Sequence, residues 1–536
     1  MEENNTLKKE EKKAEKFLFG WIKDNYDKIF LFVLFAAFII RIFIFFKTMN
    51  QPLWWDEADY LSAGKRWGLG LNIQDIWYYR RGFLWPLISA LFFRTGISEI
   101  GVRFLAVIFS TGIVAVSYLW ISEMFNKKLA LLTSISLTLS WIYLFFSGRV
   151  LTDMPAAFLI LLSFMLFWRG YILKKGDKYI YYSLAVFSFA VLMRMQSLMM
   201  APVFLAIVFP KEKYKIFTNK KLWIAFSIFL IILTPQLIFY YSHYGNPASD
   251  IATHYLGVGQ KAAESGDQRV FSFAIFNYAF DLPYVMTSWM FYLFLIGAVY
   301  FFVDLIFGFD KIFENEELHK KFFVLFFLLC LFLIMGYIGS VSYVEQRYLS
   351  VGLPFLFLIS VYPLVKLEEV LEKNMKFSKL SSSISIVIIL LVLLIPSFNL
   401  ANGMIEDKKT SFSEVEQAGL WIKENSNPSD SIISNSVPQM TYYSERSIYP
   451  FDPGFYYGTK LGNKDFLKYS ADLNGLLKFI DERRPKYIVL SSFESTPDWV
   501  NQYVQNSKGL LVPVRAYKQG DKPVLIIYEF DYGKKA

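Results

Sequence analysis

Three carboxylates stand close together just beyond the first long apolar run, which ends near Phe46. The segment that carries them reads Trp54-Trp55-Asp56-Glu57-Ala58-Asp59-Tyr60. Aromatic side chains with a polar tip favour the boundary between membrane and water. Carboxylates gain little at that boundary, so this cluster indicates chemistry, such as the acceptance of a proton by a general base.

A second segment, residues 147–155, pairs a cation with an anion. It carries Arg149 and Asp153, four positions apart, and Pro155 opens the apolar stretch that follows. Thr152 and Asp153 have an alternative interpretation, because their side-chain oxygens can cap the helix that begins there.

Two further arginines lie where apolar segments end. Arg347 and Tyr348 precede a late apolar helix, and the planar fork of an arginine is suited to holding a phosphate. Arg194 interrupts the apolar residues 179–209. A single helix there would place a charge near mid-bilayer at a cost of about 3 kcal/mol. We therefore expect a hairpin with Arg194 at its outer tip.

Charges on the outer side of a membrane protein should be few, so the exceptions carry weight. Their positions at the ends of several predicted spans suggest a polar chamber under the outer leaflet. The alternative is a set of ordinary helix-end charges with long side chains that reach the water. The residues concerned are Asp56, Glu57, Asp59, Arg80, Arg81, Arg149, Asp153, Arg194, Glu345 and Arg347.

The composition indicates a membrane protein. Of 536 residues, 55% are hydrophobic and 19% aromatic, and the mean hydropathy is +0.36. The net charge of +9 does not indicate a nucleic-acid partner, because the lysines cluster in short loops between apolar runs. The single cysteine, Cys330, excludes an internal disulfide and a cysteine metal site.

Apolar stretches near the length of a transmembrane helix predict about eleven spans. The positive-inside rule predicts that the basic N-terminus lies in the cytoplasm. Every second loop should then also be basic, and the sequence has this pattern. No cleavable signal peptide is evident before the first span. The protein is thus expected in the cell membrane with many passes. The predicted spans are residues 29–46, 102–122, 129–146, 156–173, 179–193, 196–209, 222–241, 288–308, 321–341, 350–366 and 384–400.

The last part of the chain changes character. Residues 413–424 and 473–480 have helical spacing, and short β-prone runs stand at 432–433, 487–490, 509–514 and 524–530. The alternation predicts a small extracytoplasmic α/β domain. We expect a basic N-terminal tail (1–28), a mostly α transmembrane domain (29–401) and this α/β domain (402–536).

The motifs together resemble one enzyme family, the polyprenyl-phosphate-sugar glycosyltransferases with the GT-C fold. This family includes the dolichyl-phosphate-mannose protein mannosyltransferases and the aminoarabinose transferases of lipid A. The resemblance covers roughly residues 30–400. It rests on Trp54-Trp55-Asp56-Glu57 after the first span, on Arg149 with Thr152-Asp153-Met154-Pro155, and on Arg347-Tyr348.

The resemblance implies a reaction and roles for the residues. A sugar, such as mannose or another hexose or pentose, would pass from a polyprenyl or dolichyl phosphate to an acceptor hydroxyl on a protein, lipid or glycan. Asp56 would act as the general base with help from Glu57, and Asp153 would orient an arginine or the acceptor. The donor phosphate would be held by Arg347 with Tyr348, and by Arg149, Arg194, Arg80 and Arg81.

The resemblance implies no cofactor, although Asp56, Glu57 and Asp153 are hard oxygen ligands that suit a divalent metal. Two other functions fit a polytopic membrane protein. A flippase or transporter of lipid-linked sugars would place its polar groups near mid-membrane in inverted repeats, which the sequence does not display. A non-catalytic scaffold would tolerate the loss of Asp56.

Overall fold

The computed structural model describes residues 17–533 apart from 75, 78–80, 245–274, 313, 342–344, 376, 453–467 and 508. The chain forms two compact units. We call them the bundle unit (1–47, 104–238 and 246–405) and the α/β unit (48–103, 239–245 and 406–536). The predicted domain boundaries stay a prediction, but the packing groups the segment 48–103 with the end of the chain.

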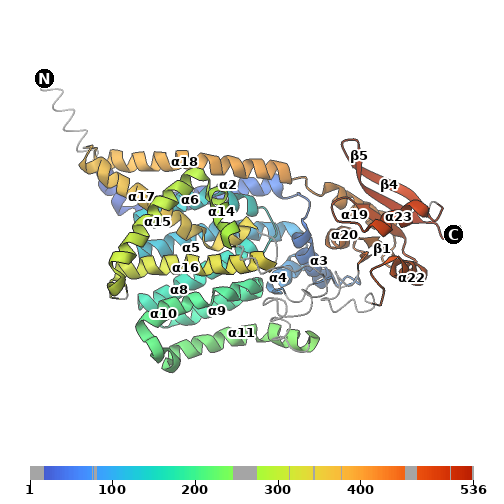
Figure 1. Cartoon of the computed structure of the whole chain (residues 1–536), viewed down its shortest axis with the longest axis horizontal. Helices are drawn as coiled ribbons and strands as arrows, with labels where there is room; N and C mark the ends of the chain where they lie inside the picture. Colours follow the sequence, from blue (N-terminus) through green and yellow to red (C-terminus); the bar gives the residue numbers. More distant parts are fainter. Residues whose placement is uncertain are drawn as a thin grey trace, which may run out of the picture. The chain divides into compact units, whose positions relative to one another are not determined.

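The bundle unit is helical (Figure 1). Its helices, some of which continue into the α/β unit, are α2 (Tyr26–Thr48), α5 (Ser98–Met124), α6 (Lys127–Thr138), α7 (Trp141–Phe146), α8 (Asp153–Phe167), α9 (Lys178–Met193), α10 (Pro202–Glu212), α11 (Lys220–Tyr244), α14 (Ile275–Met286), α15 (Ser288–Phe307), α16 (Glu316–Val341), α17 (Leu353–Lys373) and α18 (Lys379–Lys408). A π-helical turn, Trp168–Ile172, continues α8. Short 3₁₀ helices lie at Met195–Met200, Lys213–Thr218, Phe309–Lys311 and Gln346–Val351.

Seven helical segments among the described residues are long and apolar enough to cross a membrane. This confirms a polytopic helical bundle. The predicted spans 179–193 and 196–209 correspond to shorter apolar helices, and 350–366 corresponds to α17, a helix of 21 residues with Pro363 inside it. The expected single span at 129–146 is wrong in detail, because α6 ends at Thr138 and α7 begins only at Trp141. The side of the membrane on which each terminus lies stays a prediction.

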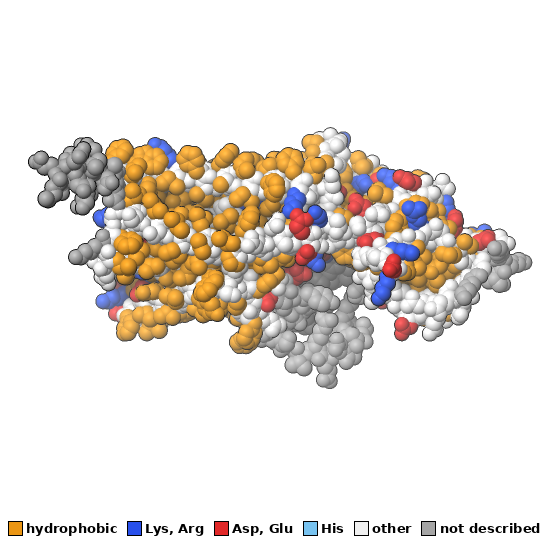
Figure 2. Space-filling view, turned by 90° about the horizontal axis from the view of Figure 1, so that it is seen from above, with side chains coloured by type: hydrophobic (Ala, Val, Ile, Leu, Met, Phe, Trp, Pro, Cys, Tyr) orange, Lys and Arg blue, Asp and Glu red, His pale blue; other side chains and the backbone are white. Residues whose placement is uncertain are grey.

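The surface of the bundle unit is that of a protein in lipid. Figure 2 shows apolar side chains gathered over its helices, and large ones such as Phe32 and Phe307 are 72% and 86% exposed. Contiguous apolar surface of this extent is rare on soluble proteins. Inside, the buried ring of Trp120 packs against Phe164, Phe323 and Phe355, so aromatic contacts join α5, α8, α16 and α17.

The α/β unit contains a five-stranded sheet in the order β2-β1-β3-β5-β4. β1 pairs in parallel with β2 and β3, whereas β5 is antiparallel to β3 and β4. The strands are β1 (Ser431–Ser434), β2 (Ser447–Tyr449), β3 (Tyr487–Ser491), β4 (Leu511–Gln519) and β5 (Lys522–Phe530). The helices are α3 (Trp55–Leu69), α4 (Leu84–Arg94), α19 (Ser413–Asn425), α20 (Val437–Ser444), α22 (Leu473–Arg483) and α23 (Asp498–Asn506).

The predicted α/β character of the tail is confirmed, and its predicted helices and strands all appear. Three elements were not predicted: α20, β2 and α23. Helix α3 begins at Trp55, so Asp56 and Glu57 of the acidic segment lie in its first turn.

Two glycines allow α3 to approach α4 closely. A Cβ atom added at Gly64 would lie 2.5 Å from Ser89 Cβ, and one added at Gly68 would lie 2.5 Å from the carbonyl oxygen of Ala90. Real Cβ atoms do not come so close, so the two helices would have to separate.

We therefore expect Gly68→Ala to lower the free energy of unfolding by about 1–3 kcal/mol, as overpacked sites do. The matched control is Gly403→Ala in α18, where an added Cβ has no atom within 4 Å. Since alanine favours a helix over glycine, the control should be neutral or slightly stabilising. Thermal unfolding in detergent measures both, and equal behaviour of the two variants would contradict the packing argument.

Candidate active site

The acidic segment begins helix α3, and its carboxylates have two different settings. Glu57 caps the helix, whereas Asp56 and Asp59 pair with an arginine. The backbone N–H of Trp54 donates to Glu57 Oε2 at 2.8 Å, so Glu57 caps the helix that contains it. The Glu57 side chain is fully buried. Its geometry is that of a structural group, and its predicted help to Asp56 in catalysis stays a prediction.

Asp56 and Asp59 share one cation. Arg81 places its Nη2 3.1 Å from Asp56 Oδ1 and its Nη1 3.2 Å from Asp59 Oδ2. The Asp59 side chain is only 3% exposed, whereas that of Asp56 is 33% exposed. Asp56 is therefore held in position by Arg81 and still has a surface that a second molecule can reach.

Arg81 remains charged in this setting. Burial alone would lower the pKa of its guanidinium, but Tyr60, Asp56 and Asp59 together outweigh burial and raise that pKa. The guanidinium also lies 5.2 Å from the centre of the Tyr60 ring. A phosphate contact of Arg81 stays a prediction, and Arg80 lies outside the described residues.

A second cluster of charged and aromatic side chains lies in the bundle unit. Its residues come from three places where helices begin or end. Asp153 is the first residue of α8, Arg194 has an extended backbone where α9 ends, and Arg347 and Tyr348 belong to the 3₁₀ helix before α17. The predicted interruption at Arg194 is thus confirmed. The structure brings together four predicted site residues that are as much as 195 positions apart in the chain (from 153 to 348).

The contacts in this cluster centre on Asp153. Arg194 Nη1 lies 3.0 Å from Asp153 Oδ1, and Arg347 Nη1 lies 3.9 Å from Asp153 Oδ2. The ring of Tyr348 lies 4.8 Å from the Arg194 guanidinium and 5.5 Å from that of Arg347. Glu345 reaches Arg347 Nε at 3.5 Å from a more exposed position. Two guanidinium groups therefore share one buried carboxylate.

Helix capping does not explain Thr152, so that alternative is wrong for this residue. Thr152 makes no side-chain capping hydrogen bond to α8. Its hydroxyl instead accepts a hydrogen bond from Arg194 Nη1 at 3.3 Å. Both residues serve to hold Arg194.

A cavity of about 40 Å³ opens beside the cluster. That volume holds a few water molecules. Its polar wall is formed by Asp153, Arg194 and Tyr348 with Gln196 and Ser197, and α16 supplies apolar side chains, including Leu331. Asp153 Oδ2 is buried and makes no hydrogen bond within the described part of the chain. A small polar group can therefore bind next to the Arg194 guanidinium, in surroundings that are partly apolar.

Arg149 was also predicted to contact the phosphate. Arg149 is 1% exposed, and its guanidinium lies 5.7 Å from the ring of Phe145. Its predicted contact with a phosphate stays a prediction. Gln196 and Ser197 were not predicted as site residues. Asp59 was predicted to belong to the polar chamber but was given no role of its own. Its pairing with Arg81 could have been expected, because residues three apart in a helix share a face and Asp56 is its neighbour on that face.

The two clusters do not provide an obvious metal centre. Across the described residues, no group of three His, Cys, Asp or Glu side chains is placed to hold a metal ion. The expectation that no cofactor is required, with a divalent metal as the alternative, stays a prediction.

Comparisons with known proteins agree with the GT-C fold that was expected from the sequence. Residues 81–239 match the family model described as "Dolichyl-phosphate-mannose-protein mannosyltransferase". No curated protein sequence matches the chain.

Two solved structures are similar over nearly the whole chain. The first is ArnT from Cupriavidus metallidurans bound to undecaprenyl phosphate. It has a TM-score of 0.57 and 12% identity, and the match covers 95% of this chain and 98% of that chain. The second is the oligosaccharyltransferase AglB from Archaeoglobus fulgidus, in complex with an inhibitory peptide and a dolichol-phosphate. It has a TM-score of 0.59 and 12% identity, with coverage of 96% and 75%. The chain therefore has the GT-C fold of these membrane glycosyltransferases, and its residues 81–239 resemble the protein mannosyltransferases in sequence.

Proposed function

We propose that the protein is a membrane glycosyltransferase that moves a sugar from a polyprenyl or dolichyl phosphate to an acceptor hydroxyl. The observation that carries this proposal is the pair of arginines, Arg194 and Arg347, which share the buried carboxylate of Asp153 beside a cavity. Support also comes from the fold, since ArnT has been solved with undecaprenyl phosphate and AglB with a dolichol-phosphate. The match of residues 81–239 to the mannosyltransferase family points in the same direction.

The reaction exchanges one bond at the sugar for another. The acceptor oxygen forms a bond to the anomeric carbon, and the bond from that carbon to the phosphate oxygen breaks. The hydroxyl proton goes to the Asp56 carboxylate, and polyprenyl phosphate leaves with the bonding electrons. Asp56 suits the task because Arg81 fixes its orientation while a third of its side chain stays exposed.

The leaving phosphate gains negative charge as the bond breaks. Cations that are already in place stabilise that charge at little cost in reorganisation, especially where water is scarce. Arg347 and Arg194 meet this requirement, because Asp153 and the Tyr348 ring hold both guanidinium groups. The apolar wall from α16 suits a ligand with an isoprenoid chain.

The finer assignments come from the resemblance. We propose a hexose or pentose as the sugar, with mannose as the first candidate, and an acceptor on a protein, lipid or glycan. The active side would be the outer face of the cell membrane, in the cell envelope. Glycans and glycolipids compared between cells with and without the protein would identify both the sugar and the acceptor.

Asp153→Asn tests the phosphate site directly. The substitution removes the carboxylate charge that two guanidinium groups share, so we expect a loss of up to about 3 kcal/mol in the free energy of unfolding. A bound phosphate would replace the missing anion. Added undecaprenyl phosphate should therefore raise the melting temperature of the variant more than that of the parent protein.

The control is Asp177→Asn, which removes the partner of Lys221 in an exposed ion pair of the same unit. It should change neither the stability nor the response to the lipid appreciably. An equal response of Asp153→Asn and the parent protein to undecaprenyl phosphate would count against a phosphate at this cluster.

A further inference from the structure

The segment that leads into α3 is held by hydrogen bonds at three backbone groups, those of Gln51, Leu53 and Trp54. Arg103 Nη2 donates to the carbonyl oxygen of Gln51 at 2.8 Å. The N–H of Leu53 donates to the hydroxyl oxygen of Tyr443 at 2.9 Å, and the N–H of Trp54 donates to Glu57. Buried backbone groups need such partners, and here side chains supply all three. Only the Tyr443 hydroxyl comes from the C-terminal part of the chain.

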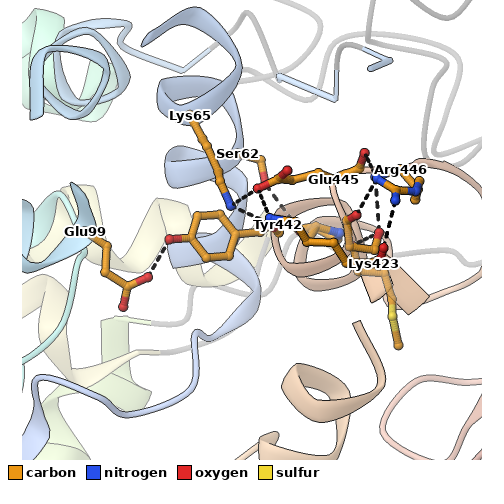
Figure 3. Close-up of polar contacts among 10 residues, drawn as sticks. Ser62, Lys65, Glu99, Lys423, Tyr442, Glu445 and Arg446 are labelled. Atoms are coloured by element: carbon orange, nitrogen blue, oxygen red, sulfur yellow. Dashed lines mark hydrogen bonds and ion pairs between the residues drawn. The ribbon is translucent and has the colours of Figure 1, made fainter. Parts of the chain in front are cut away.

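Helix α20, which carries Tyr443, is attached along the length of α3 (Figure 3). Lys65 Nζ, one turn from the end of α3, lies 2.7 Å from Glu445 Oε1 and donates to the carbonyl oxygen of Tyr442 at 3.1 Å. Ser62 Oγ donates to the carbonyl oxygen of Pro438 at 3.3 Å. Burial lowers the pKa of Lys65, and its contact with Glu445 opposes that change. These contacts fix the position of α20 along the axis of α3.

The Tyr442 side chain adds a second attachment. Its hydroxyl donates to Glu99 Oε2 at 2.5 Å, and Glu99 in turn pairs with Arg103 at 3.0 Å. Because Arg103 also holds Gln51, the C-terminal helix is linked to the start of the acidic segment by two routes. One passes directly through Tyr443, and the other passes through Tyr442, Glu99 and Arg103.

Helix α20 is itself held firmly against the sheet. The Arg446 guanidinium donates to the carbonyl oxygens of Lys423 and Ser426 at 2.9 Å and 2.7 Å, which joins the end of α20 to the end of α19 (Figure 3). Met440 belongs to the apolar core on this side of the sheet, and Trp55, the residue before Asp56, packs against that core. The position of the acidic segment is therefore defined by the folded C-terminal part of the chain.

We propose that the C-terminal α/β fold positions Asp56 for catalysis, with Tyr443 as the positioning residue that fixes the entry to α3. The inference rests on the proposed function, in which Asp56 accepts the acceptor's proton. Tyr443 touches neither the donor nor the acceptor in this account. It acts by satisfying the Leu53 N–H, three residues before Asp56, so that the helix can begin only where it does.

Tyr443→Phe is the variant that tests this role. It keeps the ring, which is 7% exposed, and removes the hydroxyl oxygen that accepts the hydrogen bond from the Leu53 N–H. The start of α3 can then move to find another partner for that N–H. A displacement on the order of 1 Å at a catalytic group costs up to about a hundredfold in rate. We expect kcat to fall by about tenfold to a hundredfold, while the KM for the donor stays within about twofold.

The matched control is Tyr487→Phe. Tyr487 is 2% exposed, and its hydroxyl donates to the carbonyl oxygen of Asn425 at 2.9 Å, within the same C-terminal fold. The two variants lose comparable hydrogen bonds and should lose comparable stability. If the C-terminal part only stabilises the protein, they will have the same kcat per folded molecule. If Tyr443 positions Asp56, only Tyr443→Phe will lose kcat.

The assay uses the full-length protein in liposomes and a panel of polyprenyl-phosphate hexoses and pentoses, with Asp56→Asn measured alongside. Full activity of Asp56→Asn would overturn the proposed base and the inference with it. If Asp56→Asn is inactive but Tyr443→Phe has the same kcat as Tyr487→Phe, the inference about Tyr443 is overturned and the proposed base is not. Lys65→Met, which removes the ion pair to Glu445, provides a second variant, and it should also lower kcat without changing the donor KM.

Discussion

Asp56→Asn is expected to lower kcat for sugar transfer by about 10² to 10⁴-fold, the range usual for the loss of a general base. The amide has nearly the shape of the carboxylate but cannot take the acceptor's proton. The protein should remain folded, because Asp59 still pairs with Arg81 at 3.2 Å and Glu57 still caps α3. Transfer from a polyprenyl-phosphate sugar, normalised to folded protein, measures the effect.

Asp59→Asn is the matched control for this variant. It neutralises a second aspartate that contacts the same arginine, but the Asp59 side chain is only 3% exposed. We expect a loss of stability and a decrease in kcat of less than about tenfold, since only the support of Arg81 is weakened. Normal turnover by Asp56→Asn, or a larger defect in Asp59→Asn, would show that the base has been assigned to the wrong residue.

Arg347→Ala is expected to weaken binding of the donor. A hydrogen bond to a charged group contributes about 1.5–3 kcal/mol, which corresponds to a Kd for the polyprenyl phosphate about 10 to 150 times higher. Arg347→Lys should lie between the parent protein and Arg347→Ala, because lysine retains the charge and loses the planar fork. Titration of the purified protein with undecaprenyl phosphate gives these values.

The control for the arginine variants is Arg169→Ala. Arg169 belongs to the same unit and pairs with Glu123 at 3.0 Å, and it lies in the π-helical turn at the opposite end of α8 from Asp153. It should leave the Kd for undecaprenyl phosphate unchanged. If Arg347→Ala leaves the Kd for undecaprenyl phosphate unchanged, Arg347 does not bind the phosphate.

Much of the fold can be predicted from the sequence because its periodicities are strong. Apolar runs near the length of a membrane span indicate the bundle, and the change to short alternating helices and strands after residue 402 indicates the α/β fold. The break at Arg194 follows from the cost of a charge within the bilayer. Each of these inferences depends on local composition, which the sequence states directly.

The packing of residues 48–103 against the C-terminal part could not be predicted in this way. The contact between Leu53 and Tyr443 joins residues 390 positions apart, and no local pattern in either segment requires the other. Helix α20 was missed for a related reason. It is only eight residues long, begins with Val437 and Pro438, and owes its helical state to packing between α3 and α19.

The site was predicted in part. The residue types were sufficient to single out Asp153, Arg194 and Arg347, but not to show that one aspartate would hold both arginines. In the same way the sequence placed Glu57 beside Asp56 as a helper of the general base, but did not show that Glu57 also caps α3. The prediction that the acidic cluster and the arginine cluster line a common chamber stays a prediction.

The most direct test of the central claim follows the sugar and the lipid in one experiment. The protein is placed in liposomes with a polyprenyl-phosphate sugar labelled on the sugar, and membranes from the producing cells supply the acceptor. We predict one molecule of free polyprenyl phosphate for each sugar transferred, and neither product with Asp56→Asn. Labelled donor that crosses the bilayer intact, with no polyprenyl phosphate released, would contradict the account and identify a flippase instead.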